Sequence, residues 1–271
     1  MEKFGLLGEH LGHSFSTTIH SLFYKKMGIS GEYKLYEKKA EDIKALLEEV
    51  RNGKLKGLNV TIPYKLEVMK YLDELSEEAE QIGAVNTIAY KDDKLIGYNT
   101  DYYGFLETLK INDVDVDGKR ILILGTGGAA KAIYSTLVSL GADKIYLATI
   151  ERNDSFRIRD RDVLIRYVDI KNLDNIEGII NCTPVGMFPE IDNVPMADDE
   201  LIDVNFLIDV IYNPEKTTLM EKYSLKGAKT MNGLMMLVVQ AIRSEEIWND
   251  IKIDDIIIKE IYEDIRKILY K

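Results

Sequence analysis

The chain has 271 residues, of which 46% are hydrophobic and 30% charged, and its formal net charge is −11. This composition is typical of a globular protein with one large domain or two ordinary ones. The acidic balance argues against binding to nucleic acid, which needs clustered Lys and Arg. The single cysteine, Cys182, excludes an internal disulfide and a multi-cysteine metal site. Because no apolar run reaches the length of a membrane span or a signal peptide, we expect a cytoplasmic protein without a membrane partner.

Residues 1–101 alternate short strands with amphipathic helices. The apolar periodicity predicts strands at residues 3–7, 32–36 and 58–62, helices at residues 17–27, 40–50 and 66–82, and a β-hairpin at residues 84–98 that turns at Asp92-Asp93. Three histidines, at positions 10, 13 and 20, lie close together, but no acidic residue or cysteine completes a metal site around them. We therefore expect no bound metal.

The pattern changes after residue 101. Residues 118–149 read as a strand, a glycine turn, a helix and a second strand, which is a βαβ unit. Further buried strands are predicted at 178–181 and 207–210, and helices from residue 233 onward. The sequence thus predicts an α/β fold with two domains. A mixed-sheet substrate domain takes residues 1–101 plus about 234–271, and a Rossmann-like domain with a parallel sheet takes residues 102–233.

The glycine turn, Gly125-Thr126-Gly127-Gly128-Ala129-Ala130, fits the G-x-G-x-x-A pattern of dinucleotide-binding sites. In that pattern the first glycine permits a tight turn and the second lets a pyrophosphate approach the backbone at a helix N-terminus. The alternative is a turn retained only for packing. Because the motif follows a strand and opens a helix, we expect it to bind a dinucleotide.

The next strand indicates which dinucleotide. An NAD site typically has an acidic residue at the tip of that strand, about 20 residues beyond the glycines. Here the strand ends at Thr149 without an acid, which favours NADP. Arg152, Arg157 or Arg159 is a candidate ligand for the 2′-phosphate, and the alternative for these arginines is a solvated loop.

Polar residues stand where apolar runs of the first domain break off. Ser14 and Ser16 begin a helix, where serines commonly act as caps. Asn59, Thr61 and Lys65 end the stretch GLNVTIPYK, Asn86 lies in GAVNT, and Asp101 ends GYNTD. Each one alone is explained by a turn or a cap. Together they predict strand and loop ends that converge on one cleft.

These stretches resemble the shikimate dehydrogenase family. The matching motifs are GHSFSTTIH, NVTIPYK, GAVNT, YNTDYYGF, GTGGAAKA, NCTPVGM, IYNPEKT and NGLMMLVVQA, in the family's order, between residues 8 and 248. The resemblance implies an oxidoreductase that interconverts 3-dehydroshikimate and shikimate by hydride transfer with NADP, in the biosynthesis of chorismate and aromatic amino acids. The partner it implies is this small-molecule substrate, in a monomer or homodimer.

The resemblance also implies roles for individual residues. Lys65 and Asp101 correspond to the family's catalytic pair, and whether Lys65 acts as a base or as a stabilising charge is left open. Ser14 and Ser16 correspond to the serines that hold the substrate carboxylate. The ring hydroxyls are assigned to Thr61, Asn86, Asp101 and Gln240, and Tyr212 borders the site. The implied cofactor-binding residues are Gly125, Thr126, Gly127, Gly128, Ala129, Thr149, Arg152, Thr183 and Gly233.

The chain departs from the family pattern at several positions. Thr17 stands where proline usually follows the serines, and Thr149 stands where the family has an arginine for the NADP phosphate. The segment after Thr149 lacks the spacing of a helix, so we expect a helix to be missing there. NAD thus remains a possible cofactor. The alternative functions are a quinate or quinate/shikimate dehydrogenase and a non-catalytic dinucleotide-binding relative.

Overall fold

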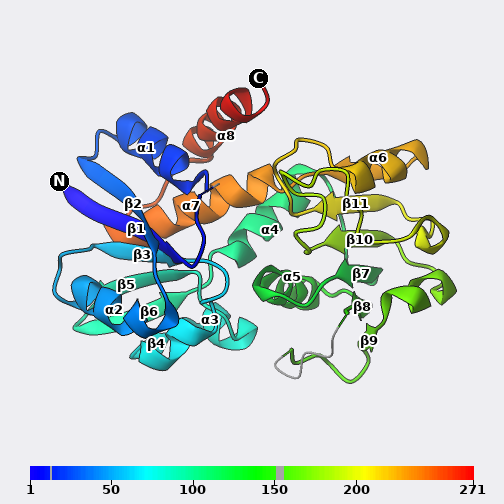
Figure 1. The fold of residues 1–271 in the computed structure, drawn as a ribbon, viewed down its shortest axis with the longest axis horizontal. Coiled ribbons are helices and arrows are strands. Elements are labelled where there is room, and N and C mark those ends of the chain that lie inside the picture. Colours follow the sequence, from blue (N-terminus) through cyan, green and yellow to red (C-terminus); the bar gives the residue numbers. More distant parts are fainter. Residues whose placement is uncertain (13, 151–155) are drawn as a thin grey trace. The chain divides into compact units, whose positions relative to one another are not determined.

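A computed structural model describes residues 1–12, 14–150 and 156–271 of the chain (Figure 1). The chain divides into two compact units. Unit 1 comprises Met1–Gly104 and Val238–Ile268, and unit 2 comprises Phe105–Leu237 and Leu269–Lys271. The boundaries fall inside two helices, α4 (Asp101–Ile111) and α7 (Leu234–Asn249), whereas the sequence analysis placed them at the starts of these helices.

Unit 1 is built on a mixed sheet whose strands follow the order β2-β1-β3-β5-β6-β4. Strand β1 pairs in parallel with β2 and β3, whereas β5 pairs antiparallel with β3 and β6. In chain order the elements are β1 (Glu2–Gly8), α1 (Ser16–Met27), β2 (Gly31–Glu37), a 3₁₀ helix (Ala40–Asp42), α2 (Ile43–Arg51), β3 (Gly57–Val60), a 3₁₀ helix (Glu67–Tyr71), β4 (Glu74–Leu75), α3 (Glu77–Ile82), β5 (Thr87–Lys91), β6 (Lys94–Tyr98), the start of α4, most of α7, and α8 (Asp255–Leu269).

Helices cover the sheet of unit 1 because their apolar residues recur at helical spacing. Helix α2 buries Ile43, Leu46, Leu47 and Val50 in one cluster with residues of β3, β5 and β6. A second group of buried aromatic side chains joins β1 to α1 and α7, because the Phe4 ring stacks on Tyr24 and on Trp248 with centroids 5.6 and 5.0 Å apart. Helices α1 and α8 lie side by side in Figure 1. Lys26 of α1 pairs with Glu260 and Asp264 of α8 at 2.9 and 3.3 Å.

The predicted helix over residues 66–82 is wrong, because the structure divides this segment into a 3₁₀ helix, the short strand β4 and helix α3. Asp73 causes the break: its backbone N–H donates to the Leu95 carbonyl at 2.9 Å and its carboxylate accepts from the Leu95 N–H at 2.7 Å. Ser76 then caps a new helix by accepting from the Ala79 N–H at 3.3 Å. The apolar residues of this segment have helical spacing, so the sequence pattern gave no sign of the hydrogen bonds between Asp73 and Leu95 of β6. These bonds join residues that are distant in sequence.

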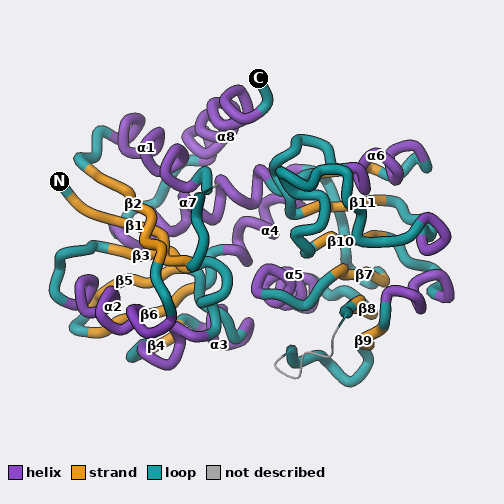
Figure 2. Tube along the Cα trace, viewed as in Figure 1, coloured by secondary structure: helices purple, strands orange, loops and turns teal. Residues whose placement is uncertain are grey.

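Unit 2 is built on a parallel sheet in the order β12-β11-β10-β7-β8-β9, and most of its strands can be followed in that order in Figure 2. All pairs in this sheet are parallel. In chain order the elements are the end of α4, β7 (Arg120–Leu124), α5 (Gly128–Ser139), β8 (Lys144–Ala148), β9 (Val163–Ile165), a 3₁₀ helix (Tyr167–Asn172), β10 (Gly178–Asn181), a 3₁₀ helix (Asp198–Glu200), β11 (Phe206–Asp209), α6 (Thr218–Leu225), β12 (Lys229–Met231) and the start of α7.

Both faces of this sheet are buried, which explains its continuous apolar strands. Along β7, Ile121 and Ile123 join the cluster with α5, whereas Leu122 and Leu124 join the cluster with α6. This alternation follows from the period of two in a strand. Between β8 and β9 the described residues 156–162 form no helix, and residues 151–155 of the segment in which a missing helix was expected lie outside the described residues.

Candidate active site

The predicted substrate residues of unit 1 lie at one edge of its sheet. Strands β1 and β3 run in parallel with Leu7 opposite Val60, so both end at this edge. Strand β5 runs the opposite way and begins here, with Thr87 opposite Asn59 and Tyr98. The loops that leave β1, β3 and β6 and the loop that enters β5 therefore meet at the same edge. This register brings together polar residues from positions 14 to 101.

The centre of this edge is a close pair between Lys65 and Asp101. Lys65 Nζ lies 2.5 Å from Asp101 Oδ2, and the two side chains are 12% and 9% exposed. Lys65 belongs to the loop after β3. A hydrogen bond from the Val85 N–H to the Lys65 carbonyl, at 2.8 Å, fixes the backbone of this loop. Asp101 is the first residue of α4. The pair thus presents an ammonium group and a carboxylate with restricted freedom but with access to a ligand.

Asn86 holds the second carboxylate oxygen of Asp101. Its Nδ2 donates to Asp101 Oδ1 at 3.0 Å, and its own Oδ1 accepts from the Thr100 N–H at 2.7 Å. Thr87 Oγ1 also donates to Asn86 Oδ1 at 3.0 Å. Because a backbone N–H can only donate, these contacts fix which end of the Asn86 amide faces Asp101. Measured over whole residues, Asn86 and Asp101 are 2% and 7% exposed, so both are buried.

The other predicted substrate residues of unit 1 lie on α1, β3 and α7 or next to these elements. Ser14 precedes α1 and its Oγ accepts from the Ser16 N–H at 3.3 Å, while Ser16 is the first residue of the helix. Thr61 directly follows β3, and its N–H donates to the Leu7 carbonyl at 2.9 Å. Gln240 lies on α7, half-buried. His13, which directly precedes Ser14, lies outside the described residues.

The sequence analysis missed a buried polar network behind these residues. Asn59, which the sequence left without a clear role, donates from Nδ2 to Thr87 Oγ1 at 3.0 Å and to Ser244 Oγ at 2.8 Å, and its Oδ1 accepts from the Tyr33 hydroxyl at 2.7 Å. Thr87 is the last residue of the quoted stretch GAVNT, but the sequence analysis assigned it no role. Ser244 and Tyr33 gave no signal, because only the fold brings α7 and β2 to Asn59.

The predicted dinucleotide residues of unit 2 also share one edge of a sheet. Leu124 pairs with Ala148 and Asn181, and Asn181 pairs with Asp209, so β7, β8, β10 and β11 all end here. Gly125 follows β7 with φ of +93°, a conformation that favours glycine. Gly127 is exposed, and a Cβ added to it meets nothing within 4 Å. The space over the N-terminus of α5, which begins Gly128-Ala129, is therefore open to a phosphate.

The expected 2′-phosphate region holds Thr149, and the two described candidate arginines differ, since Arg159 is paired and Arg157 is exposed. Thr149 Oγ1 lies 3.3 Å from Thr126 Oγ1. Arg159 is bound within its own loop, since its Nε donates to Asp162 Oδ2 at 2.7 Å and its Nη2 donates to the Ala142 carbonyl at 3.1 Å. Arg157 is exposed. Arg152, the arginine assigned to the cofactor, lies outside the described residues.

Thr183 is held by a second network that the sequence did not indicate. Its N–H and hydroxyl donate to Asn181 Oδ1 at 3.0 and 2.7 Å, and Asn181 Nδ2 donates to Asp209 Oδ1 at 3.0 Å. Asp209 Oδ2 accepts from the Thr217 hydroxyl at 2.8 Å. Burial raises the pKa of Asp209 to about 6, and these hydrogen bonds oppose the rise. A buried carboxylate thus anchors the loop after β10.

Two further predicted residues belong to unit 2. The Tyr212 carbonyl accepts from the Tyr270 hydroxyl at 2.6 Å. Gly233 precedes α7, and a Cβ there would lie 1.9 Å from the Val210 carbonyl oxygen, so the chain needs glycine at this point. The position of Gly233 is therefore explained by close backbone packing.

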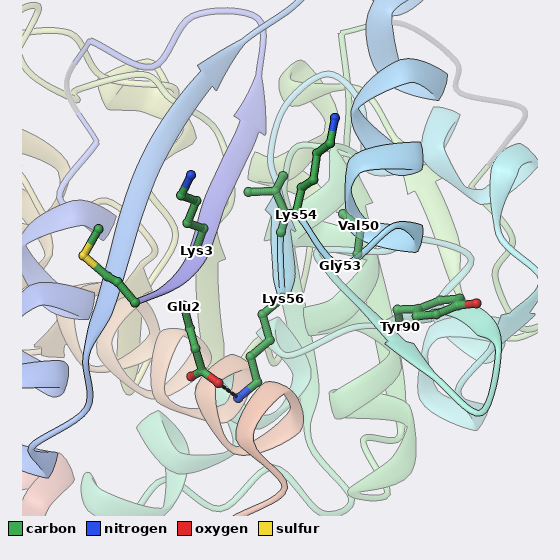
Figure 3. Close-up of a pocket in the computed structure, with 9 residues that line it drawn as sticks. Glu2, Lys3, Val50, Gly53, Lys54, Lys56 and Tyr90 are labelled. Carbon is green, nitrogen blue, oxygen red and sulfur yellow. Dashed lines mark hydrogen bonds and ion pairs between the residues drawn. The ribbon is translucent and has the colours of Figure 1, made fainter.

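A pocket of about 410 Å³ lies at the opposite edge of the unit 1 sheet, where β1 and β3 begin (Figure 3). Glu2 pairs there with Lys56 at 2.6 Å, and Lys3, Lys54 and Tyr90 also line the pocket. None of the predicted site residues lies in it. The predicted site residues at the ends of β1 and β3 thus lie at the other edge of the sheet from this cavity.

Across residues 1–12, 14–150 and 156–271, no three His, Cys, Asp or Glu side chains are grouped closely enough to hold a metal ion. Within the same ranges, every helix is too short or too polar to cross a lipid bilayer.

Comparison with known proteins agrees with the motifs. The family model for the shikimate dehydrogenase substrate binding domain matches residues 6–88. A curated relative from Clostridium beijerinckii, named Shikimate dehydrogenase (NADP(+)), is 43% identical over 264 residues, which make up 97% of each chain. The chain belongs to the shikimate dehydrogenase family.

Solved structures of shikimate dehydrogenases share the fold. Shikimate Dehydrogenase 1 from Peptoclostridium difficile matches with a TM-score of 0.93 and 41% identity, and the match covers 100% of both chains. Shikimate 5-dehydrogenase from Listeria monocytogenes, solved in complex with shikimate and NAD, matches with a TM-score of 0.85 and 32% identity over 96% of both chains. The predicted family and α/β fold class are confirmed.

Proposed function

We propose that this protein interconverts 3-dehydroshikimate and shikimate by hydride transfer with NADP. The observation that carries the proposal is the contact of 2.5 Å between Lys65 and Asp101, in a setting where Asn86 fixes the carboxylate. Unit 1 binds the substrate and unit 2 binds the dinucleotide. The names of the relatives, which specify shikimate and NADP, support this assignment.

Oxidation of a secondary alcohol requires removal of a hydride from carbon and of a proton from the hydroxyl oxygen. The nicotinamide, when bound, accepts the hydride. Lys65 and Asp101 handle the proton. A substrate hydroxyl that contacts both residues gives its proton to the Asp101 carboxylate, while the Lys65 ammonium group stabilises the developing alkoxide. Asn86 keeps the carboxylate in place during this step, because it occupies Asp101 Oδ1.

The rest of the edge suits a hydroxylated ring with one carboxylate. Ser14 and Ser16, after β1, supply hydroxyl donors for the carboxylate, and Thr61 and Gln240 supply polar groups for ring hydroxyls. Such a substrate is bound by several hydrogen bonds. An analogue that lacks one of its hydroxyls or its carboxylate leaves a polar group of the site unpaired and therefore binds more weakly. This donor set supports shikimate over a substrate without a carboxylate.

The dinucleotide is held at the edge of unit 2. Backbone N–H groups after Gly127 face the open space over α5, where a pyrophosphate fits the positive end of the helix. Thr149, in place of the family's arginine, favours NAD as a second cofactor. The Listeria monocytogenes relative, solved with NAD, supports testing both.

The test is to mix the purified protein with shikimate and NADP or NAD and to follow reduced nicotinamide by absorbance. Lys65→Ala is expected to lower kcat by about 10²- to 10³-fold, the range for loss of one group that stabilises a developing negative charge on oxygen. Affinity for the dinucleotide is expected to stay the same, because Lys65 belongs to unit 1. Asp101→Asn is expected to lower kcat similarly and to weaken shikimate binding more.

Lys70→Ala is the matched control. Lys70 is 67% exposed and pairs only at the surface, with Glu67 at 2.6 Å, so its removal is expected to leave kcat unchanged. Circular dichroism establishes that each variant is folded. Parental turnover in folded Lys65→Ala would contradict the proposed role of the pair and favour a protein that binds the ligands without catalysis.

A further inference from the structure

Four buried polar side chains contact Asn86 or one another in the interior of unit 1. Asn59 belongs to β3, Thr87 begins β5, Thr100 directly precedes α4, and Ser244 lies on α7. Asn59 is 5% exposed and the other three are 0% exposed. Because buried polar groups are nearly always hydrogen-bonded, the contacts within this group decide which way each side chain is turned.

The orientation of the Asn86 amide follows from the Thr100 backbone. The Thr100 N–H, which can only donate, lies 2.7 Å from one end of the amide, so that end is Oδ1. The other end is the NH₂ group, and it donates to Asp101 Oδ1 and to Thr100 Oγ1, each at 3.0 Å. In the reverse orientation an amide oxygen would face the carboxylate, which would lose this donor. A group that holds Asn86 Oδ1 in place therefore also keeps the donor on Asp101.

Thr87 has its hydroxyl at Asn86 Oδ1. Thr87 Oγ1 lies 3.0 Å from that oxygen, 3.0 Å from Asn59 Nδ2 and 2.8 Å from Ser244 Oγ. The Asn59 group is an NH₂ group, since it also lies 3.2 Å from the Asn86 carbonyl oxygen, which can only accept. Thr87 thus accepts from Asn59. Its own proton is left for one of two near acceptors, Asn86 Oδ1 or Ser244 Oγ.

Ser244 decides between these two acceptors. Its Oγ lies 2.8 Å from Thr87 Oγ1 and 3.0 Å from the carbonyl oxygen of Gln240, one turn earlier in α7. If Ser244 donates to Thr87, the Thr87 proton goes to Asn86. If Ser244 donates to Gln240, the Thr87 proton lies between the two hydroxyl oxygens and Asn86 loses it.

The first arrangement is favoured by the charge on Asp101. The Asn86 amide donates to this carboxylate, which makes the amide oxygen a stronger acceptor for the Thr87 proton. The Gln240 carbonyl, in contrast, already accepts from the backbone of its own helix. The protons therefore point from Ser244 to Thr87, from Thr87 to Asn86, and from Asn86 to Asp101.

We propose that Thr87 is a positioning residue whose hydroxyl holds the Asn86 amide in the one orientation that donates to Asp101. The proposal rests on the proposed function, because it takes Asp101 as the group that receives the substrate proton. Thr87 is 0% exposed and does not touch a ligand. Because chemistry is more sensitive than binding to a small misplacement of a catalytic group, Thr87 acts on kcat more than on shikimate affinity.

The first experiment replaces Thr87 with valine and with serine. Valine has the shape of threonine and suits a strand, but it lacks the hydroxyl. Thr87→Val is expected to lower kcat about three- to tenfold, as for loss of one neutral hydrogen bond, and to change shikimate affinity, measured by calorimetry, by less than about twofold. Thr87→Ser restores the hydroxyl and is expected to return kcat to within about twofold of the parent.

Ser244→Ala tests the direction of the protons. Without Ser244, Thr87 has Asn86 Oδ1 at 3.0 Å as its nearest acceptor, so kcat is expected to stay within about twofold of the parent. A loss as large as that of Thr87→Val would overturn the proposal. It would show that the packing of α7 on the sheet matters and the Thr87 proton does not.

A double-mutant cycle tests whether Thr87 acts through Asn86. Asn86→Ala is expected to lower kcat about 10- to 100-fold, as for loss of a charge-assisted hydrogen bond. In that background Thr87→Val is expected to change kcat by less than about twofold, whereas independent effects would multiply. Full multiplication would mean that Thr87 affects only the strand that carries it.

Thr136→Val is the matched control. Thr136 is also 0% exposed, and its hydroxyl also makes a buried hydrogen bond, to the Ala132 carbonyl at 2.9 Å, but it lies on α5 of unit 2. The same substitution is expected to lower the thermal stability without changing kcat. A fall in kcat equal to that of Thr87→Val would mean that loss of a buried threonine hydroxyl anywhere in the chain has this effect.

Exchange of the Asn86 side-chain NH₂ protons with water, followed by NMR, gives a measurement that needs no turnover. The signals are identified by their absence from Asn86→Ala. Thr87→Val is expected to speed this exchange about threefold or more, and Thr87→Ser is expected to leave it unchanged. Parental kcat and parental exchange in Thr87→Val would refute the positioning role while leaving the proposed function intact. If the parent does not oxidise shikimate, the proposed function is wrong, and the exchange rates alone decide whether Thr87 holds the amide.

Discussion

Replacing Asp209 with asparagine is expected to change how stability depends on pH. The side chain of Asp209 is 0% exposed, and its charge is opposed by no described cation. Its carboxylate accepts from Asn181 Nδ2, the Ile211 N–H and the Thr217 hydroxyl. Burial raises the pKa from its usual 3.8 to about 6, and the hydrogen bonds only reduce that rise.

The sign follows from which state holds the proton. Between pH 3.8 and about 6 the folded protein keeps the proton on Asp209 and the unfolded chain releases it, so the free energy of unfolding falls as the pH rises. One pKa unit corresponds to 1.36 kcal/mol, so the full effect is about 3 kcal/mol, of which about 2 kcal/mol falls between about pH 4.5 and 7.5. Above about pH 6 both states are ionised and the effect is complete.

Asparagine can preserve the contacts without the charge. Its Oδ1 can accept from Asn181 and Ile211, and its NH₂ group can donate to Thr217, whose hydroxyl proton then turns away. Relative to the parent, Asp209→Asn is therefore expected to gain about 2 kcal/mol between pH 4.5 and 7.5. Urea unfolding by circular dichroism at four pH values measures this difference, and hydrogen exchange of β10 and β11 locates it in unit 2.

Asp162→Asn is the control of opposite sign. Asp162 is 5% exposed, and although burial alone would raise its pKa, hydrogen bonds from Arg159, Tyr134 and the Ile145 N–H hold the pKa below its usual range. That group stabilises the fold above its unfolded pKa, and the stabilisation is lost as the pH falls. Asp162→Asn is thus expected to lose stability relative to the parent as the pH rises. A difference for Asp209→Asn that is the same at every pH would refute the argument from burial.

The remaining predictions concern the dinucleotide. Gly127→Val is expected to leave the free energy of unfolding within about 1 kcal/mol, because its Cβ meets no atom of the protein, yet to weaken NADP by at least about tenfold, because the side chain occupies the space for a pyrophosphate. Calorimetry with NADP and thermal unfolding test both parts, and unchanged NADP affinity would make the glycine loop structural only. Thr149→Arg is expected to raise the preference for NADP over NAD by about 10- to 100-fold in kcat/KM, the value of a charge-assisted hydrogen bond. An unchanged ratio would mean that another residue already holds the 2′-phosphate.

Local patterns were sufficient where the physical cause is local. The period of two in β7 and the glycine turn after it predicted the βαβ unit, because apolar strands and φ of +93° at Gly125 depend on neighbouring residues. The hairpin at Asp92-Asp93 was predicted for the same reason, since both residues have positive φ in the turn. The prediction of a helix over residues 66–82 was wrong because the hydrogen bond between Asp73 and Leu95 joins residues that are distant in sequence.

The sequence by itself determined the family, the α/β class and the residue types that the chemistry requires, Lys65 and Asp101 among them. Only the tertiary structure decided that these two lie 2.5 Å apart, that Asn59 faces Tyr33, and that Asp209 supports the loop of Thr183. These contacts join residues of different strands and helices. Their geometry depends on the register of the sheets and on which polar side chains are buried against one another. Neither can be predicted from the spacing of residues along the sequence.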